Sequence, residues 1–109
     1  MNSNFTVGLL NVVYNNAMFL SGSDASCIEI IINDFIRADR MFNELDNIDY
    51  SNISDERLER LERKYNVASD IWANAFNKAK ELTDKYDGCI RLWYKNNPSV
   101  RVSSLYNNN

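Results

Sequence analysis

Histidine is absent from the 109-residue sequence, and cysteine occurs only twice, as Cys27 and Cys89. Histidine is the commonest general base and metal ligand, so its absence removes the usual means of acid–base and zinc chemistry. Two cysteines are too few for a closed cysteine zinc site or a disulfide framework. No glycine-rich phosphate loop is present either. We therefore expect no enzyme and no metal or cofactor, and we interpret both thiols as structural groups in a reducing compartment.

Glycine and proline are also scarce, with three glycines and a single proline, Pro98. Neither residue type interrupts positions 24 to 87, which favours long helices over many short strands. The length is close to the commonest size for one hydrophobic core, so we predict a single all-α domain over residues 1–109. The net charge of −3 is too small for a DNA mimic and has the wrong sign for coating nucleic acid.

Charge is missing altogether from residues 1–23. A secretory signal peptide needs basic residues ahead of its apolar run, and here asparagines interrupt that run. The segment is also too short and too polar to span a bilayer. We interpret it as a neutral amphipathic helix, and we expect a protein in the cytoplasm of a cell or host cell with no membrane contact.

Apolar residues recur at helical spacing in the first half of the chain. A first helix is predicted over residues 4–20, with Gly8 and Asn11 on its polar face and Gly22 as a stop signal. A second helix is predicted over residues 24–45, where Ser23-Asp24 provides an N-cap. Its heptad seam is wide enough to contact neighbours on two sides, so this helix should be the central one.

A third apolar stripe runs from a second Ser-Asp start at residues 54–55 to about residue 87. Ser69-Asp70 repeats the Ser-Asp signature, which favours a break. The heptad phase nevertheless passes from Tyr65 to Trp72 undisturbed, and a loop would normally reset it. We therefore favour one helix of about 33 residues in an antiparallel three-helix bundle. The alternative is a four-helix bundle with a break near Ser69.

A continuous third helix would be longer than the body that covers it. A hairpin centred near residue 50 would set Cys27 opposite Ala73, so residues 74–87 would extend beyond it by about 20 Å. The apolar stripe there needs cover from the C-terminal segment, a second copy or another protein. Leu82→Asp should then abolish an oligomer without unfolding the chain. The predicted partner interface consists of Trp72, Phe76, Ala79, Leu82 and Tyr86.

The C-terminal segment is basic, because residues 89–109 carry three cations and no acid. Cations and aromatic rings alternate there, a mixture typical of single-stranded nucleic-acid or nucleotide binding. The alternative is that the rings pack on the chain's own body. Residues 99–106 could form a short extended piece, and residues 104–109 are predicted to be disordered. The possible nucleic-acid contacts are Arg91, Trp93, Tyr94, Lys95 and Arg101.

These patterns predict a small non-enzymatic interaction or assembly protein. It would act through self-association, through a protein partner, or through both, using the third helix and the C-terminal segment. Binding of nucleic acid or a nucleotide is the alternative. Seventeen asparagines indicate an AT-rich genome, so we also consider a phage or viral accessory protein.

Overall fold

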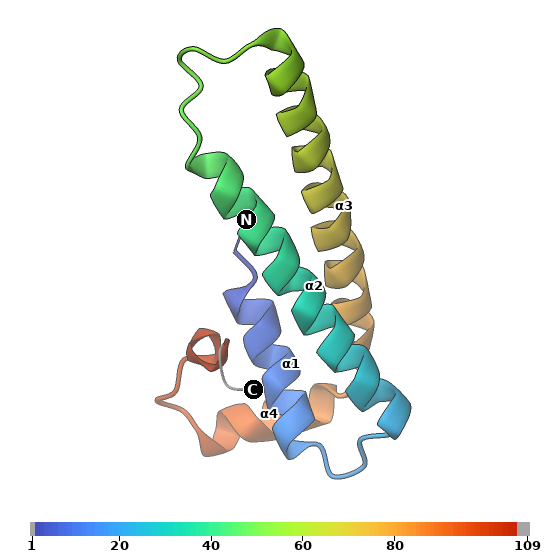
Figure 1. Cartoon of the computed structure of the whole chain (residues 1–109). Helices are drawn as coiled ribbons and strands as arrows, with labels where there is room; N and C mark the ends of the chain where they lie inside the picture. Colours follow the sequence, from blue (N-terminus) through green and yellow to red (C-terminus); the bar gives the residue numbers. More distant parts are fainter. Residues whose placement is uncertain (1, 107–109) are drawn as a thin grey trace.

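The computed structural model describes residues 2–106, and all of its regular structure is helical over that range. The elements are α1 (Asn4–Asn16), α2 (Gly22–Asp46), α3 (Asp55–Lys85), α4 (Asp87–Asn96) and the 3₁₀ helix η1 (Val102–Leu105). The described chain is elongated, with extents of 53 × 30 × 19 Å (Figure 1). The prediction of an all-α fold is confirmed.

Serine side chains cap both long helices. Ser21 Oγ accepts a hydrogen bond from the Asp24 amide at 3.0 Å, and Ser54 Oγ accepts one from the Arg57 amide at 3.2 Å. Each bond satisfies one of the amides that a helix start leaves without a partner. The cap of α2 is therefore Ser21 and not Ser23, and Gly22 begins that helix instead of ending the one before.

The connection between α1 and α2 starts earlier than the apolar spacing predicted. Ala17 has an extended ψ of 124°, which ends α1 at Asn16, four residues before the predicted end. Ala17 and Leu20 pack against the core, so both ends of the connection are fixed. The two residues between them, Met18 and Phe19, face solvent.

Helix α3 runs through Ser69 and Asp70 without a break. Ala68 is buried and Trp72 packs against the α2–α3 core, so the apolar seam continues across the Ser-Asp pair. The chain turns at Tyr86, which ends α3 and precedes α4. Gly88 lies inside α4.

The register of α2 and α3 places the end of α3 beside the start of α2. Lys85 pairs with Asp24, and the ring centroids of Phe35 and Trp72 lie 5.9 Å apart. Cys27 is therefore not opposite Ala73 as predicted, and residues 74–87 do not extend beyond the body. The excess length of α3 lies at the other end, because the α2–α3 connection runs back along the first turns of α3 (Figure 1).

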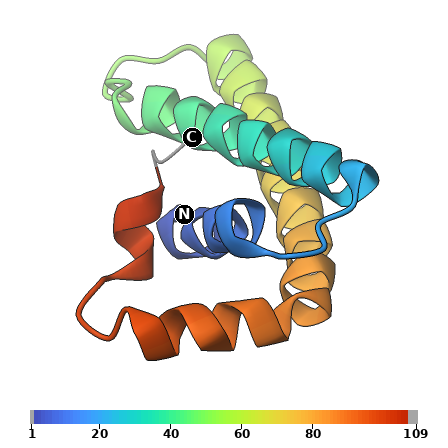
Figure 2. The same cartoon turned by 90° about the horizontal axis from the view of Figure 1, so that it is seen from below.

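Helix α1 lies between the α2–α3 pair on one side and α4 with η1 on the other (Figure 2). The main core joins all of these elements. Its fully buried side chains are Val7, Leu10, Val12, Val13, Ile28, Ile31, Phe35 and Ala79.

The C-terminal segment packs on the face of α1 that the sequence marked as polar. A Cβ atom on Gly8 would lie 2.0 Å from the carbonyl oxygen of Val102, so only glycine admits the backbone of η1 there. Asn11 is fully buried and donates to the carbonyl of Leu105. This face is therefore covered, because short or absent side chains let another segment approach closely.

Residues 102–105 form a 3₁₀ helix in place of the predicted extended piece. Disorder was expected from residue 104, yet Leu105 and Tyr106 pack against the core, and the Tyr106 hydroxyl donates to Asp39 at 3.2 Å. The remaining part of that expectation, residues 107–109, lies outside the described residues.

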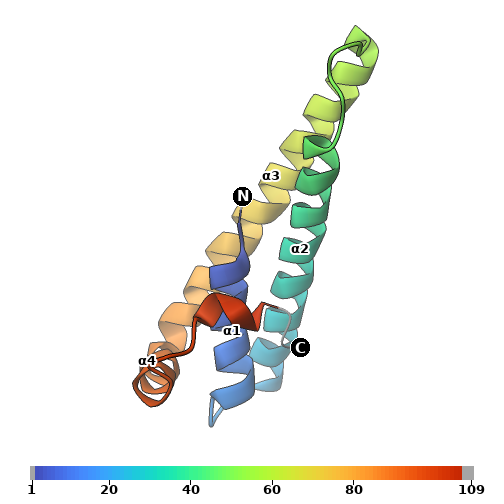
Figure 3. The same ribbon diagram turned by 90° about the vertical axis from the view of Figure 1, so that its left-hand side faces the viewer.

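Beyond the start of α1, only α2 and α3 continue. They form a two-helix arm, residues 40–66, that ends in the α2–α3 connection (Figure 3). A second, smaller core cluster of Ala38, Phe42 and Ala68 lies at its base. No third helix within residues 2–106 covers the arm.

Candidate interaction surfaces

The predicted partner interface on α3 is mostly internal. Ala79 is fully buried and Leu82 is 6 % exposed, both in the main core. Trp72 packs between Phe35 and Phe76, with ring centroids 5.9 and 5.3 Å away. Only Phe76 of this set leaves a large apolar area in solvent. The stripe is covered by the chain's own helices, so it does not offer the continuous partner surface that we predicted.

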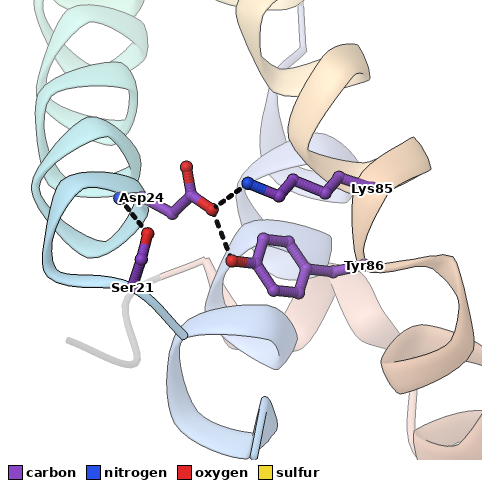
Figure 4. Close-up of polar contacts among 4 residues, drawn as sticks. All are labelled: Ser21, Asp24, Lys85 and Tyr86. Atoms are coloured by element: carbon purple, nitrogen blue, oxygen red, sulfur yellow. Dashed lines mark hydrogen bonds and ion pairs between the residues drawn. The ribbon is translucent and has the colours of Figure 1, made fainter. Parts of the chain in front are cut away.

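Tyr86, the last member of that set, takes part in a polar cluster (Figure 4). The Asp24 carboxylate accepts hydrogen bonds from the Lys85 ammonium group at 2.7 Å and from the Tyr86 hydroxyl. The bond from Lys85, followed by that from Tyr86, lowers the pKa of Asp24. The same carboxylate raises the pKa of Lys85 and of Tyr86. The cluster fastens the end of α3 to the start of α2.

The geometry of α4 places the tryptophan and the cations of the basic–aromatic segment on opposite sides of the helix. Successive residues of a helix turn by about 100°, so Trp93 lies about 160° around the axis from both Arg91 and Lys95. Trp93 packs against the core, and its ring meets Tyr94 edge-on. Arg91 is 80 % exposed and pairs with Asp87. Arg101 is exposed on the segment before η1. The structure therefore does not bring the cations and the buried indole onto one face.

Among residues 2–106, the two most exposed large apolar side chains lie at the end of the molecule that α4 crosses. Met18 is 86 % exposed and Phe19 is 87 % exposed, and Leu92 of α4 is 58 % exposed nearby. We call Met18, Phe19 and Leu92 the end face. Met18 and Leu92 border one shallow groove, the end groove, together with Asn16, Gly88, Cys89, Trp93, Asn96 and Asn97.

Sequence reasoning missed the end face because it counted Met18 and Phe19 as part of the first helix. No glycine or proline marks the end of α1 at Asn16, so periodicity alone extended the helix. The only local signal is the pair Asn15-Asn16, since asparagine favours helix ends and turns.

A second groove lies at the tip of the arm, between the α2–α3 connection and the first turns of α3. Its charged lining residues are Asp46 and Glu62, and neither forms an ion pair with any residue from 2 to 106. Tyr50 and Tyr65 are 44 % and 49 % exposed at this site. We call it the arm groove; its apolar lining residues are Leu45, Ile48, Leu58 and Leu61.

A third groove separates α1 from α3. Phe5 is 55 % exposed and Phe76 is 39 % exposed, and both line it. Lys80 is its only charged lining residue. The remaining lining residues are Thr6, Leu9 and Thr83.

The thiols are not arranged for reaction or metal binding. Burial raises the pKa of Cys89, which keeps that thiol protonated and poorly nucleophilic. Cys27 packs against the main core. Within residues 2–106 no three acidic, cysteine or histidine side chains are grouped to hold a metal ion.

None of the helices in the described range combines the length and the apolar character needed to cross a bilayer. Comparisons of the chain with models of protein families, with curated proteins and with solved structures found no match.

Proposed function

We propose that this chain is a non-enzymatic interaction protein that assembles with other protein chains through its end face. The scaffold is interpreted as a three-helix bundle of α1, α2 and α3, with α4 added across one end. The observation that carries the proposal is the exposure of Met18 and Phe19 at 86 % and 87 %. Large apolar side chains gathered on a fixed surface mark contact sites for other macromolecules.

The attachment of the α1–α2 connection supports this function. Ala17 and Leu20 are packed in the core on either side of Met18 and Phe19. The two exposed side chains are thus presented on a short connection held at both ends, which lowers the entropy lost when a partner binds. Leu92 and the end groove extend the apolar area across α4.

Photo-crosslinking tests the proposal in the cells that make the protein. A benzophenone amino acid replaces Phe19 in one variant and Asn74, an exposed residue of α3, in a control. We expect a discrete protein adduct from position 19 and not from position 74. Equal or absent adducts at both positions would overturn the proposal. The phage or viral origin inferred from the asparagine content stays a separate prediction.

A further inference from the structure

Exposed charges of opposite sign lie at the two ends of the long axis. Asp46 and Glu62 line the arm groove, whereas Arg91 and Lys95 are exposed on α4. The arm groove lies at one end of the long axis and α4 crosses the other (Figures 1 and 3). One copy therefore carries an acid-edged groove and a basic helix that face away from each other.

The arm groove has the composition of a site for a basic amphipathic helix. Leu45, Ile48, Leu58 and Leu61 supply apolar contacts, and Asp46 and Glu62 supply carboxylates. No lysine or arginine lines it, so both carboxylates are available to an incoming cation. Basic amphipathic helices dock in this way, with apolar anchors in the groove and cations at acidic edges.

The outward face of α4 matches that description. Leu92 is 58 % exposed, and it lies about 60° around the helix axis from Lys95 and about 100° from Arg91, so both exposed cations are on one side of it. Lys95 forms no ion pair with the residues described, and Arg91 pairs only with the exposed Asp87. A leucine beside two cations on the exposed side of a helix is complementary to an apolar groove with two carboxylates.

We propose that the arm groove of one copy binds the outward face of α4 of a second copy, so that the chain assembles head to tail. This inference rests on the proposed function and names its partner. The two contacting surfaces are different, so the interface is heterologous, and a pair of copies leaves one groove and one α4 face unused. Such contacts build a ring if the rotation closes and a filament if it does not.

The α4 helix of one copy cannot reach the arm groove of the same copy. α4 is joined directly to the end of α3, whereas the groove is formed by the first turns of that same helix. The part of α3 from Tyr65, the last residue that lines the groove, to Lys85 separates the two surfaces by about 30 Å at 1.5 Å per residue. Contact between them requires a second molecule.

Two single-sided variants test the head-to-tail contact. Leu58→Asp blocks the arm groove and Leu92→Asp blocks α4; both residues are exposed by a third or more. By sedimentation velocity each variant alone should be monomeric, with association weakened at least tenfold relative to the wild type. Mixed in equal amounts, they should form a one-to-one dimer, because the intact α4 of the first binds the intact groove of the second. Circular dichroism and thermal melting check that both remain folded.

Charge exchange provides a second test that leaves the apolar residues untouched. Lys95→Glu and Glu62→Lys should each weaken association. An equal mixture of the two should associate again, because the native α4 of Glu62→Lys meets the native groove of Lys95→Glu. The matched controls, Lys78→Glu and Glu59→Lys, make the same changes of net charge at exposed sites outside both surfaces and should associate like the wild type.

Two results would overturn the inference. One is a wild-type protein that stays monomeric at all concentrations; the other is a mixture of Leu58→Asp and Leu92→Asp that forms no dimer although the wild type associates. An adduct between position 19 and a different protein, together with a purified protein that stays monomeric, would refute self-assembly and retain the proposed function. If position 19 forms no adduct and the purified protein is also monomeric, the proposed function itself is refuted.

Discussion

Lys85, the last residue of α3, donates a hydrogen bond to Asp24 in the first turn of α2, although 61 positions separate them in the sequence. This contact lies in the same register of the two longest helices that sets Phe35 beside Trp72. That register places the end of α3 level with the start of α2, so α1 and α4 can cover Ala79 and Leu82. The long helix is therefore covered at this end by its own chain, and its unpaired turns lie at the arm.

Removing that carboxylate should lower stability in a pH-dependent way. In Asp24→Asn, Lys85 and Tyr86 face a neutral amide oxygen in place of a carboxylate, so they lose the charge that strengthens both hydrogen bonds, and the free energy of unfolding at neutral pH should fall. The pKa of Asp24 is below its ordinary value of 3.8, so its contribution is present above that value and is lost as pH falls through the lowered pKa. The pKa of Lys85 is raised above 10.5, so its contribution is lost as pH rises through the raised pKa.

Urea denaturation across the pH range measures this difference between the wild type and Asp24→Asn. The difference should form a plateau between about pH 5 and 9 and shrink on both sides. Asp70→Asn, which removes an exposed carboxylate of α3 that forms no ion pair with the described residues, serves as the control. A difference independent of pH would show that the cluster does not couple the helices.

Leu82 should behave as a core residue. Leu82→Ala should destabilise the fold by about 2–5 kcal/mol, because it removes a buried side chain and leaves a cavity. Leu82→Asp should unfold the chain, contrary to the expectation drawn from the sequence. Phe19→Ala removes a large but exposed side chain and should change stability by less than about 0.5 kcal/mol. Equal effects of Leu82→Ala and Phe19→Ala in denaturant titrations would contradict this packing.

Gly8 should tolerate no side chain. Gly8→Ala forces the backbone of Val102 away from α1, so we expect a loss of about 1–3 kcal/mol and faster amide exchange in residues 102–106. Gly22→Ala is the matched control, because a Cβ there meets no atom within 4 Å. It should be neutral, or stabilising by up to about 1 kcal/mol. Unchanged exchange in Gly8→Ala would mean that η1 does not pack as described.

Single-stranded oligonucleotide should bind weakly or not at all. Trp93 is packed against the core, and Arg91 and Lys95 lie on the opposite side of α4. Of the two rings in the predicted contact set, only Tyr94, which is 40 % exposed, is left to stack a base beside those cations. Fluorescence anisotropy of a labelled oligonucleotide at two salt concentrations provides the measurement. Tight binding that weakens steeply with salt would revive the nucleic-acid alternative.

The helical class and the α2 seam could be predicted because each depends on local spacing. Ile28, Ile31, Phe35, Ala38 and Phe42 step by three and four residues, and all five are buried. The continuity of α3 through Ser69 followed from the same rule, since the apolar phase is not reset there.

The positions of segments far apart in the sequence could not be predicted in this way. A glycine and an asparagine on one helical face look alike whether solvent or a backbone covers them, so the docking of η1 on Gly8 and Asn11 gave no local signal. The eight-residue α2–α3 connection could have turned tightly or run along α3, and that choice moved the uncovered length from one end of α3 to the other.

The end face could not be predicted from the apolar pattern either, although the residues involved are close together in the sequence. Met18 and Phe19 continue the apolar pattern of α1, and only the extended backbone at Ala17 turns them into solvent. The arm groove depends on the register of α2 and α3, and it collects Asp46 and Glu62 from separate helices.

Sedimentation velocity on the purified wild-type chain, over a wide concentration range and at two salt concentrations, tests head-to-tail assembly most directly. We predict that the average sedimentation coefficient rises with concentration and falls when salt increases from about 0.1 M to 1 M, because the Debye length shrinks from about 10 to 3 Å. A single monomeric species under every condition would contradict it.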